Sequence, residues 1–380
     1  MRRAHDRPGL VALIGDWLDG TPLLTADPVE VRTNVAAVED VPVVPDAPAG
    51  FVGGGWFGRL DFTGAARFAF HDWVVRLVDG RWRFEALHTP ARAAALAARL
   101  AEWRSLVAAA ARPSLTWRVS ELDVPPAGPH LAAVESAIGL IRAGELYQVN
   151  IATRLTGRFA GSAAALFAAA VEELAPARAA FVAGPRTLVS LSPELFLRRR
   201  GRDVESAPIK GTLPLAPGND RALRRSAKDV AENVMIVDLV RNDLARVCEP
   251  GSVRPSALLD VRPAPGVWHL VSTVAGRLRE DVGDAGLLAA TFPPGSVTGA
   301  PKLRALEVID ELEPAARGTF TGAVGFAAPA GAEFNVAIRT LELDGDRLEL
   351  GVGGGITADS VPALEWQECR HKAAPLLRVA

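Results

Sequence analysis

Short strand-like segments that follow one another through turns constrain the fold of this chain more than any other feature. Residues 1 to about 90 form such a series, and residues 315–351 are predicted as three antiparallel strands, the last of them Arg347–Gly351. A further strand is expected at 146–152 and a strand pair at 187–198. The pattern predicts antiparallel sheet combined with helices, but it leaves the topology open.

Helical periodicity and turn residues divide the chain into two portions. The predicted helices are 91–111, 130–143 ending at Gly144, 226–248, and a C-terminal helix that begins near Pro362. The segment Pro125–Pro129 is rich in proline and glycine, as boundaries often are. We therefore expect an N-terminal portion at 1–120, packed on a main domain at 125–380. A chain of 380 residues is long enough to bury a large core.

Charge and cysteine content exclude several classes of protein. The net charge of −2 and pI near 6.3 give no basic field, so a nucleic-acid partner is not expected. Two cysteines, Cys248 and Cys369, are too few for a disulfide framework and have no zinc spacing. No run of about 18 uncharged apolar residues predicts a membrane span, and no secretory signal follows Met1. The sequence predicts a cytoplasmic protein.

Lysine is rare in this chain, which has 38 arginines and only Lys210, Lys228, Lys302 and Lys372. A lysine retained against that bias suggests a need for an amine that can lose its proton and act as a nucleophile. Lys210, followed by Gly211 and Thr212, is the strongest candidate. The alternative is that these lysines are ordinary solvated surface groups.

Two helices carry carboxylates that could meet. Ser226 is predicted to cap the helix at 226–248, which presents Glu232 among apolar neighbours. In the C-terminal helix, Glu365 and Glu368 share one face with Lys372. Three such glutamates would form the oxygen-only ligand set that suits Mg²⁺. Spacing alone equally allows an exposed Glu232 and a solvated pair of Glu368 and Lys372.

Two glycine-containing segments could approach an anion. Gly295–Lys302 leads into a helix with Pro301 in its first turn, where free N–H groups and Lys302 would attract a carboxylate. An ordinary capped helix start explains this pattern almost as well. Gly351–Ile356 follows a predicted strand and would let a ligand approach the backbone closely, although a tight corner uses the same residues. Neither segment matches a nucleotide-binding motif.

Taken together, several motifs resemble those of the chorismate-utilising enzymes, in the order in which that family has them. They are Tyr147–Asn150, Leu191–Phe196, Pro208–Thr212, Ala231–Asp243, His269–Thr273, Gly295–Lys302 and Gly353–Ser360. The resemblance covers about residues 125–380. It implies an α+β fold with two large, mostly antiparallel sheets in a sandwich flanked by helices, and an active site between the sheets.

Within this family, single residues distinguish the branches. Lys210 stands where anthranilate synthases carry alanine, so the likeness is to the branch called aminodeoxychorismate synthase component I. Gln148 replaces the water-activating lysine of isochorismate and salicylate synthases. Phe320 departs from the tyrosine common in anthranilate synthases. An anthranilate synthase component and a non-catalytic regulatory paralogue remain the alternatives.

The resemblance also implies a mechanism and a site. Lys210 would attack C2 of chorismate while Glu194, as general acid, helps the C4 hydroxyl to leave. Ammonia would then add at C4 and expel the lysine, giving 4-amino-4-deoxychorismate on the route to p-aminobenzoate and folate. Mg²⁺ would be held at Glu232 and Glu368, with Glu365 nearby. The implied substrate contacts are Gln148, His269, Thr298, Lys302, Arg339, Gly354 and Gly355.

The source of ammonia is the remaining expectation. Neither Cys248 nor Cys369 lies in the strand–turn–helix setting of a nucleophilic cysteine, and no glutaminase domain is recognised in the sequence. The resemblance therefore implies a separate glutamine amidotransferase subunit as partner, with free ammonium able to replace it.

Overall fold

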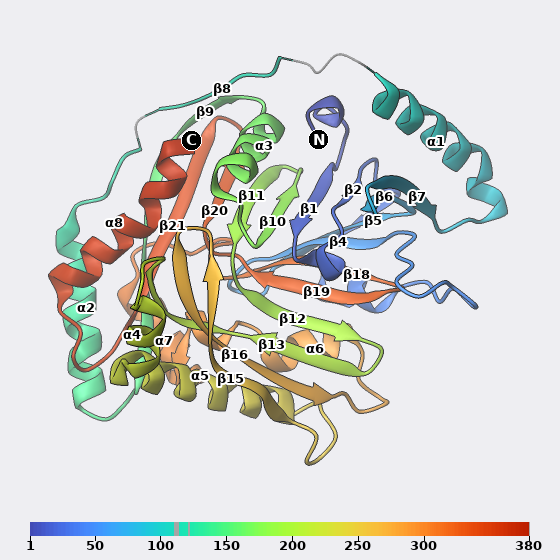
Figure 1. The fold of residues 1–380 in the computed structure, drawn as a ribbon. Helices are drawn as coiled ribbons and strands as arrows, with labels where there is room; N and C mark the ends of the chain where they lie inside the picture. Colours follow the sequence, from blue (N-terminus) through green and yellow to red (C-terminus); the bar gives the residue numbers. More distant parts are fainter. Residues whose placement is uncertain (110–113, 121, 380) are drawn as a thin grey trace.

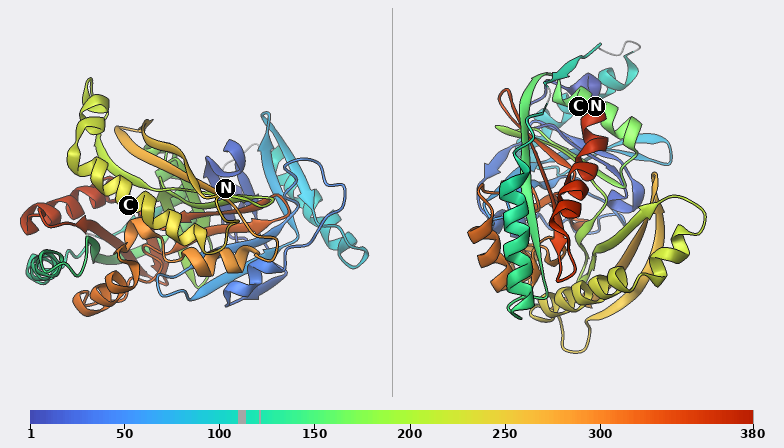
Figure 2. Two further views of the ribbon diagram at one scale, coloured as in Figure 1. Left: turned by 90° about the horizontal axis from the view of Figure 1, so that it is seen from below. Right: turned by 90° about the vertical axis from the view of Figure 1, so that its left-hand side faces the viewer.

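Two large antiparallel sheets pack face to face, and helices cover their outer surfaces (Figures 1 and 2). The computed structural model describes residues 1–109, 114–120 and 122–379. Between the sheets, side chains such as Leu13 and Leu188 from one sheet meet Phe57 and Phe326 from the other. This arrangement confirms the expected α+β sandwich.

Among the described residues, the first sheet has eleven strands and contains both early and late parts of the chain. In spatial order its strands are β17 (Gly299–Ala300), β9 (Gln148–Gly161), β21 (Arg347–Ile356), β20 (Thr340–Asp344), β11 (Arg186–Ser192), β10 (Arg178–Val182), β1 (Val11–Gly15), β2 (Leu23–Thr25), β6 (Trp73–Val78) and β7 (Arg81–Ala86). The short strand β8 (Trp117–Val119) also pairs with β9.

The second sheet has ten strands in the part of the chain that the structure describes. In spatial order they are β14 (Ile209–Pro214), β16 (Val267–Arg277), β13 (Asp203–Ala207), β12 (Leu195–Arg200), β19 (Gly331–Val336), β18 (Ala323–Ala328), β4 (Gly55–Leu60), β5 (Ala66–His71) and β3 (Glu30–Arg32). The tenth, β15 (Arg254–Ala264), pairs with β16. The strands before residue 90 join both sheets, and the expected division into 1–120 and 125–380 remains a prediction.

Helices pack on the outside of both sheets. The α-helices are α1 (Ala93–Ala108), α2 (Ala127–Arg142), α3 (Ala163–Leu174), α4 (Asn219–Arg225), α5 (Ala227–Ala245), α6 (Asp284–Thr291), α7 (Lys302–Leu312) and α8 (Pro362–Val379). Short 3₁₀ turns are η1 (Arg2–Ala4), η2 (Trp17–Gly20), η3 (Val35–Glu39), η4 (Pro90–Arg92) and η5 (Gly295–Val297). No helix in the described part of the chain is long and apolar enough to cross a membrane.

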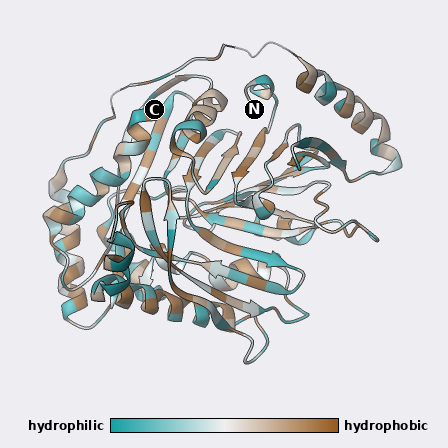
Figure 3. Cartoon of the chain, in the orientation of Figure 1, coloured by the Kyte–Doolittle hydropathy of each residue, from teal (hydrophilic) through white to brown (hydrophobic). Residues whose placement is uncertain are grey.

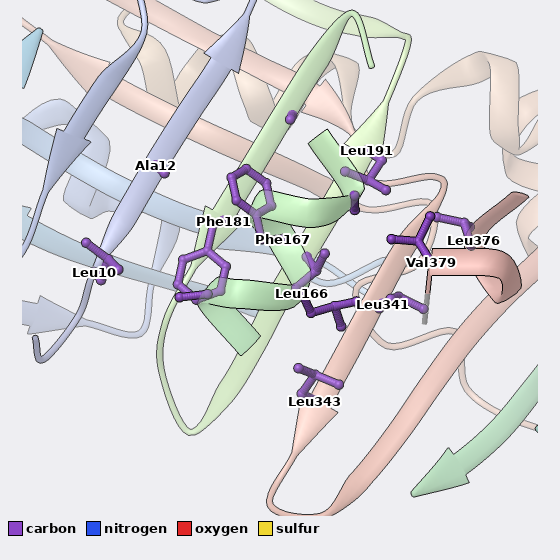
Figure 4. Close-up of a cluster of buried hydrophobic side chains, with 14 of the residues drawn as sticks. Leu10, Ala12, Leu166, Phe167, Phe181, Leu191, Leu341, Leu343, Leu376 and Val379 are labelled. Carbon is purple, nitrogen blue, oxygen red and sulfur yellow. The ribbon is translucent and has the colours of Figure 1, made fainter. Parts of the chain in front are cut away.

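Apolar side chains fix the helices to the sheets. On the outer face of the first sheet, Phe167 of α3 and Leu376 of α8 pack with Phe181, Leu191 and residues of neighbouring strands (Figure 4). On the second sheet, α5 contributes Ile236 and Leu244 to another cluster. Hydrophobic positions recur along the strands and alternate with hydrophilic ones along the helices (Figure 3), as two-faced elements require.

Three sequence expectations about strands need correction. Residues 315–351 belong to four strands, β18 to β21, and two of these lie in each sheet. The strand pair expected at 187–198 is not a pair, because β11 and β12 belong to different sheets. The glycine run at 351–355 lies within β21 and does not follow it. Hydrophobic alternation cannot reveal such sheet crossings, since buried strands of both sheets have similar patterns.

The helix predictions are closer to the structure. Ser226 caps α5 as expected, since its side chain accepts a hydrogen bond from the Asp229 N–H. Pro301, expected in the first turn of α7, is instead the residue preceding it. Helix α1 covers most of the helix expected at 91–111, and residues 110 and 111 lie outside the described residues.

Candidate active site

The site forms where the chain crosses from the first sheet to the second. Strand β11 ends at Ser192 and β12 begins at Leu195, which leaves Glu194 in the crossing. Backbone contacts hold this corner, because the Glu194 N–H donates to Ser192 Oγ at 3.1 Å and its carbonyl accepts from the Val336 N–H at 3.2 Å. The crossing therefore places a carboxyl group between the two sheets.

Glu194 is a buried carboxyl group that favours its protonated form. Its residue is 4% exposed, and burial raises the pKa to about 7. A hydrogen bond with Ser296, the charge of Lys210 and the Ile209 N–H oppose this shift without cancelling it. A carboxyl group with a pKa near neutrality can donate a proton and later recover it, as a general acid must.

Lys210 reaches the same region from β14. This strand pairs with β16, and its register shifts between Ile209 and Thr212, where Gly211 has a φ of +91°. Such an irregularity re-aims the side chain beside it. Burial lowers the pKa of the Lys210 amine, although Glu232 and Glu194 oppose the change. No described residue forms a hydrogen bond or ion pair with this amine.

His269 lies opposite Thr212 on the neighbouring strand β16. Its Nδ1 is 2.8 Å from Thr212 Oγ1, while the buried Nε2 has no hydrogen-bond partner among the residues described. Burial, with the charge of Arg339, lowers the pKa of His269 to about 4. The imidazole is therefore neutral at physiological pH, and Nε2 is free to contact a ligand.

Two glycines of β21 let other side chains converge. A Cβ atom added to Gly355 would lie 2.2 Å from Gln148 Nε2 and 3.4 Å from Lys210 Nζ. Gln148 is buried, and its Oε1 has no hydrogen-bond partner in the described structure. The absence of a side chain at Gly355 thus brings the Gln148 amide and the Lys210 amine to one spot.

The neighbouring Gly354 faces the glutamates of α8. A Cβ added to it would lie 3.2 Å from Glu365 Oε2, 3.8 Å from Glu368 Oε1 and 3.9 Å from Lys372 Nζ. Ser360 Oγ donates to Glu365 Oε1 at 2.7 Å. Lys372 Nζ is 2.7 Å from Glu368 Oε1 and donates to the Gly353 carbonyl at 2.8 Å. Both carboxylates therefore border the glycine strand.

Glu232 of α5 adds a third carboxylate to those of Glu365 and Glu368. Its buried Oε1 has no hydrogen-bond partner among the described residues, and Lys228 Nζ lies 3.8 Å away. Burial raises the pKa of Glu232, the Lys210 charge opposes this, and the charge of Glu365 adds to it. At Glu368 burial also acts to raise the pKa, but the ammonium of Lys372 and the charges of Lys228 and Lys210 together outweigh it and lower the pKa.

The donor chemistry of Glu232, Glu365 and Glu368 fits Mg²⁺. All three offer carboxylate oxygens, which this ion prefers, and one oxygen of Glu232 is buried without a partner. Within residues 1–109, 114–120 and 122–379, however, no three His, Cys, Asp or Glu side chains form a ready-made metal site. The glutamates could hold a metal once their side chains move together.

Arg339 supplies an unpaired cation. It precedes β20 with a φ of +49°, and its carbonyl accepts from the Leu191 N–H at 3.0 Å. Its guanidinium has no hydrogen bond or ion pair with any residue that the structure describes. The side chain is accessible to solvent, yet surrounding protein desolvates it and lowers its pKa. An unpaired guanidinium of this kind is suited to bind a carboxylate.

Lys302 and Thr298 do not join this group. Lys302 Nζ contacts Asp243 Oδ2 at 2.6 Å and donates to the carbonyls of Thr291 and Pro293, which uses its three donors. Thr298 Oγ1 donates within its own loop, to Pro294 O at 3.1 Å. Both residues shape the 291–300 segment in this structure, and the substrate contacts expected from them stay a prediction.

Sequence reasoning missed the parts that Ser296 and Thr212 play. Ser296 forms the hydrogen bond that opposes the pKa shift of Glu194, and Thr212 orients His269. Both lie in motifs recognised in the sequence, but no sequence pattern indicates which groups they contact. The pairing of Glu368 with Lys372, one of the alternatives that the spacing allows, is present in the structure.

Known proteins match this chain over part of its length. Over 249 residues, 62% of this chain and 54% of the relative, it is 46% identical to aminodeoxychorismate synthase component 1 of Klebsiella aerogenes. It is 41% identical over 246 residues to the same component of Escherichia coli, covering 63% and 54% of the two chains. Anthranilate synthase component 1 of Thermus thermophilus is 40% identical over 257 residues, 66% and 56% of the two chains. The matched region spans about half the length of these relatives.

Solved structures support the fold. Anthranilate synthase component I of Streptococcus pneumoniae superposes with a TM-score of 0.78 at 24% identity, covering 97% of this chain and 90% of that one. The menaquinone-specific isochorismate synthase MenF of Escherichia coli gives a TM-score of 0.81 at 20% identity, covering 99% and 90%. Residues 59–378 match the family described as chorismate binding enzyme. The chain therefore belongs to the family of chorismate binding enzymes.

Proposed function

We propose that this protein aminates chorismate at C4 to give 4-amino-4-deoxychorismate. The observation that carries the proposal is the Lys210 amine, which makes no hydrogen bond with any described residue and lies close to the proposed general acid, Glu194. Burial lowers the pKa of this amine. Relatives named aminodeoxychorismate synthase component 1 are 41% to 46% identical to the chain, and Lys210 is the residue that distinguishes that branch. The product would supply p-aminobenzoate and folate synthesis.

In the proposed first step, Lys210 is the nucleophile. Its neutral amine forms a bond to C2, both ring double bonds shift by one position, and the C4–O bond breaks. Glu194 donates its proton to the departing hydroxyl, which leaves as water. The pKa of Glu194 near 7 supports this role, because a large fraction of the group is protonated at neutral pH.

In the proposed second step, ammonia attacks C4, both ring double bonds shift back, and the C2–N bond breaks. Lys210 leaves as a neutral amine, and the new C4 ammonium group can return one proton to Glu194. Gln148 and the neutral His269 face the same region with unsatisfied atoms, which supports a part for both in holding the substrate. Arg339 would bind a carboxylate of chorismate, and Gly354 and Gly355 leave room for another.

Mg²⁺ belongs to the same proposal. Glu232, Glu365 and Glu368 would hold it, and when bound it would neutralise a substrate carboxylate and act as a Lewis acid. Among the protein groups, Lys372 would have to give up its contact with Glu368 or share it. The carboxylates of Glu365 and Glu368 themselves border the glycine strand at Gly354.

Ammonia would come from a separate glutamine amidotransferase subunit. Burial raises the thiol pKa of Cys248 to about 11 and of Cys369 to about 12, which leaves neither thiol poised as a glutaminase nucleophile. Two buried cysteines without a disulfide suit the cytoplasm, where we place the reaction.

Product identification tests the proposal. The purified protein is incubated with chorismate, MgCl₂ and ammonium chloride, and the products are separated and identified by mass and fluorescence. Aminodeoxychorismate, converted to p-aminobenzoate by an added lyase, is the expected product. Anthranilate would instead assign the protein to the anthranilate branch, and absence of turnover would favour a regulatory paralogue.

A further inference from the structure

A buried ion pair completes the edge of strand β9 beside the candidate site. Strand β17 pairs with β9 only at Gln148 and Val149, so the backbone groups farther along this edge need other partners. Arg317 Nη2 donates to the Asn150 carbonyl at 2.9 Å, and the Ala152 N–H donates to Glu313 Oε1 at 2.8 Å. Side chains thus continue the pairing where the short strand ends.

Arg317 has no spare donor. Its Nε contacts Glu313 Oε2 at 2.8 Å and its Nη2 contacts Glu313 Oε1 at 2.6 Å, which makes a bidentate pair. Its Nη1 donates to the Val297 carbonyl at 2.9 Å and to Thr321 Oγ1 at 3.1 Å. The Arg317 side chain is only 2% exposed. A planar guanidinium fully bonded in this way holds its acceptors in fixed relative positions.

The acceptors of Arg317 are next to residues of the site. Asn150 pairs with Gly355 of β21, which lies beside Gln148 and Lys210. Val297 follows Ser296, whose hydroxyl hydrogen-bonds with Glu194. One side chain therefore ties the strand that carries Gln148 to the turn that carries Ser296.

We propose that Arg317, paired with Glu313, is a positioning residue that fixes Ser296 and the start of β9, and through them Glu194 and Gln148, for the reaction. The inference rests on the proposed amination, since it assigns a role within the same site. Arg317 itself does not need to touch the substrate. Its effect is on the spacing between the general acid and the Lys210 amine.

Arg317→Lys is the main test, because lysine keeps the charge but one ammonium cannot reach all of these acceptors. We expect kcat for ammonium-dependent amination to fall about 100-fold, as small displacements of reacting groups can produce. The alkaline limb of the pH profile should also move upward, because a weaker Ser296 hydrogen bond raises the pKa of Glu194 further. A purely structural role would leave both quantities unchanged in the folded variant.

Arg76→Lys is the matched control. Arg76 is buried on β6, its guanidinium contacts Glu85 Oε1 at 3.1 Å and the Gly50 carbonyl at 2.6 Å, and neither partner is part of the site. Both variants should lower Tm, and only Arg317→Lys should lower kcat and shift the pH profile. Equal kcat losses in the two variants, or none in Arg317→Lys, would overturn the inference.

Thr321→Ala provides a milder variant in case Arg317→Lys does not fold. It removes one acceptor of Arg317 without leaving a buried charge unpaired, and we expect a fall in kcat in the same direction. Unchanged kcat in Thr321→Ala, if Arg317→Lys is unfolded, counts against the inference. If the wild type makes no aminodeoxychorismate, the proposed function fails separately. Chorismate binding measured by calorimetry then still compares Arg317→Lys with Arg76→Lys, and equal affinities would refute the positioning role.

Discussion

Glu194 should reduce the stability of the protein as the pH rises, and Glu194→Gln should remove that effect. Burial shifts the pKa of this carboxyl from 4.5 to about 7, so the folded state retains a proton that the unfolded chain releases. The resulting loss in the free energy of unfolding is absent below pH 4.5, grows as the pH rises toward 7 and is constant above it. At 1.36 kcal/mol per unit, the full cost is about 3 kcal/mol.

Chemical denaturation of both proteins at several pH values between 5 and 8.5 measures this effect. Other titrating groups cancel in the difference, and glutamine can still accept the Ser296 and Ile209 hydrogen bonds. The free energy of unfolding of Glu194→Gln minus that of the wild type should therefore increase by about 2 to 3 kcal/mol as the pH rises over this range. Glu280→Gln, at a side chain that is 86% exposed, controls for replacing an acid by an amide. A difference that stays constant or falls with pH would refute the account of Glu194 as a buried acid.

Three further predictions follow from the same contacts. Lys302→Met leaves Asp243 buried without its ammonium, and should lower the free energy of unfolding by about 3 kcal/mol in denaturant titrations; an unchanged value would contradict the structural role of Lys302. Gly355→Ala places a methyl group 2.2 Å from Gln148 Nε2 and should weaken chorismate binding about tenfold, as measured by calorimetry. An unchanged affinity would show that the substrate does not bind beside this strand. Glu232→Gln should raise the Mg²⁺ concentration needed for half-maximal activity at least tenfold, while an unchanged Mg²⁺ titration would remove Glu232 from the ligand set.

Much of the candidate site was predictable because its residues lie in short motifs. Lys210, Glu194, His269 and Gly355 were each named from the sequence, and the structure gathers them from β14, the sheet crossing, β16 and β21. These elements are far apart along the chain, and only the resemblance to a known family connected them. Composition and periodicity alone gave helices and antiparallel strands.

The remaining features depend on contacts that no local pattern encodes. Lys302 follows a helix-start motif suited to an anion, yet Asp243 of α5 and two carbonyls take its donors. The crossing between β11 and β12 was predicted as a strand pair, because alternation along the chain does not say which sheet receives a strand. Arg317 carried no signal at all, since its role comes from the edge of β9 that it completes.

The most direct test of the central claim is a search for a covalent adduct on Lys210. The wild-type protein is incubated with chorismate and MgCl₂ without ammonia, quenched with acid, and analysed by intact-protein mass spectrometry and peptide mapping. We predict a mass increase equal to chorismate less one water, located on the peptide with Lys210 and absent from Lys210→Ala. Aminodeoxychorismate formation at the wild-type rate by Lys210→Ala, with no adduct in the wild type, would contradict the claim that this amine is the nucleophile.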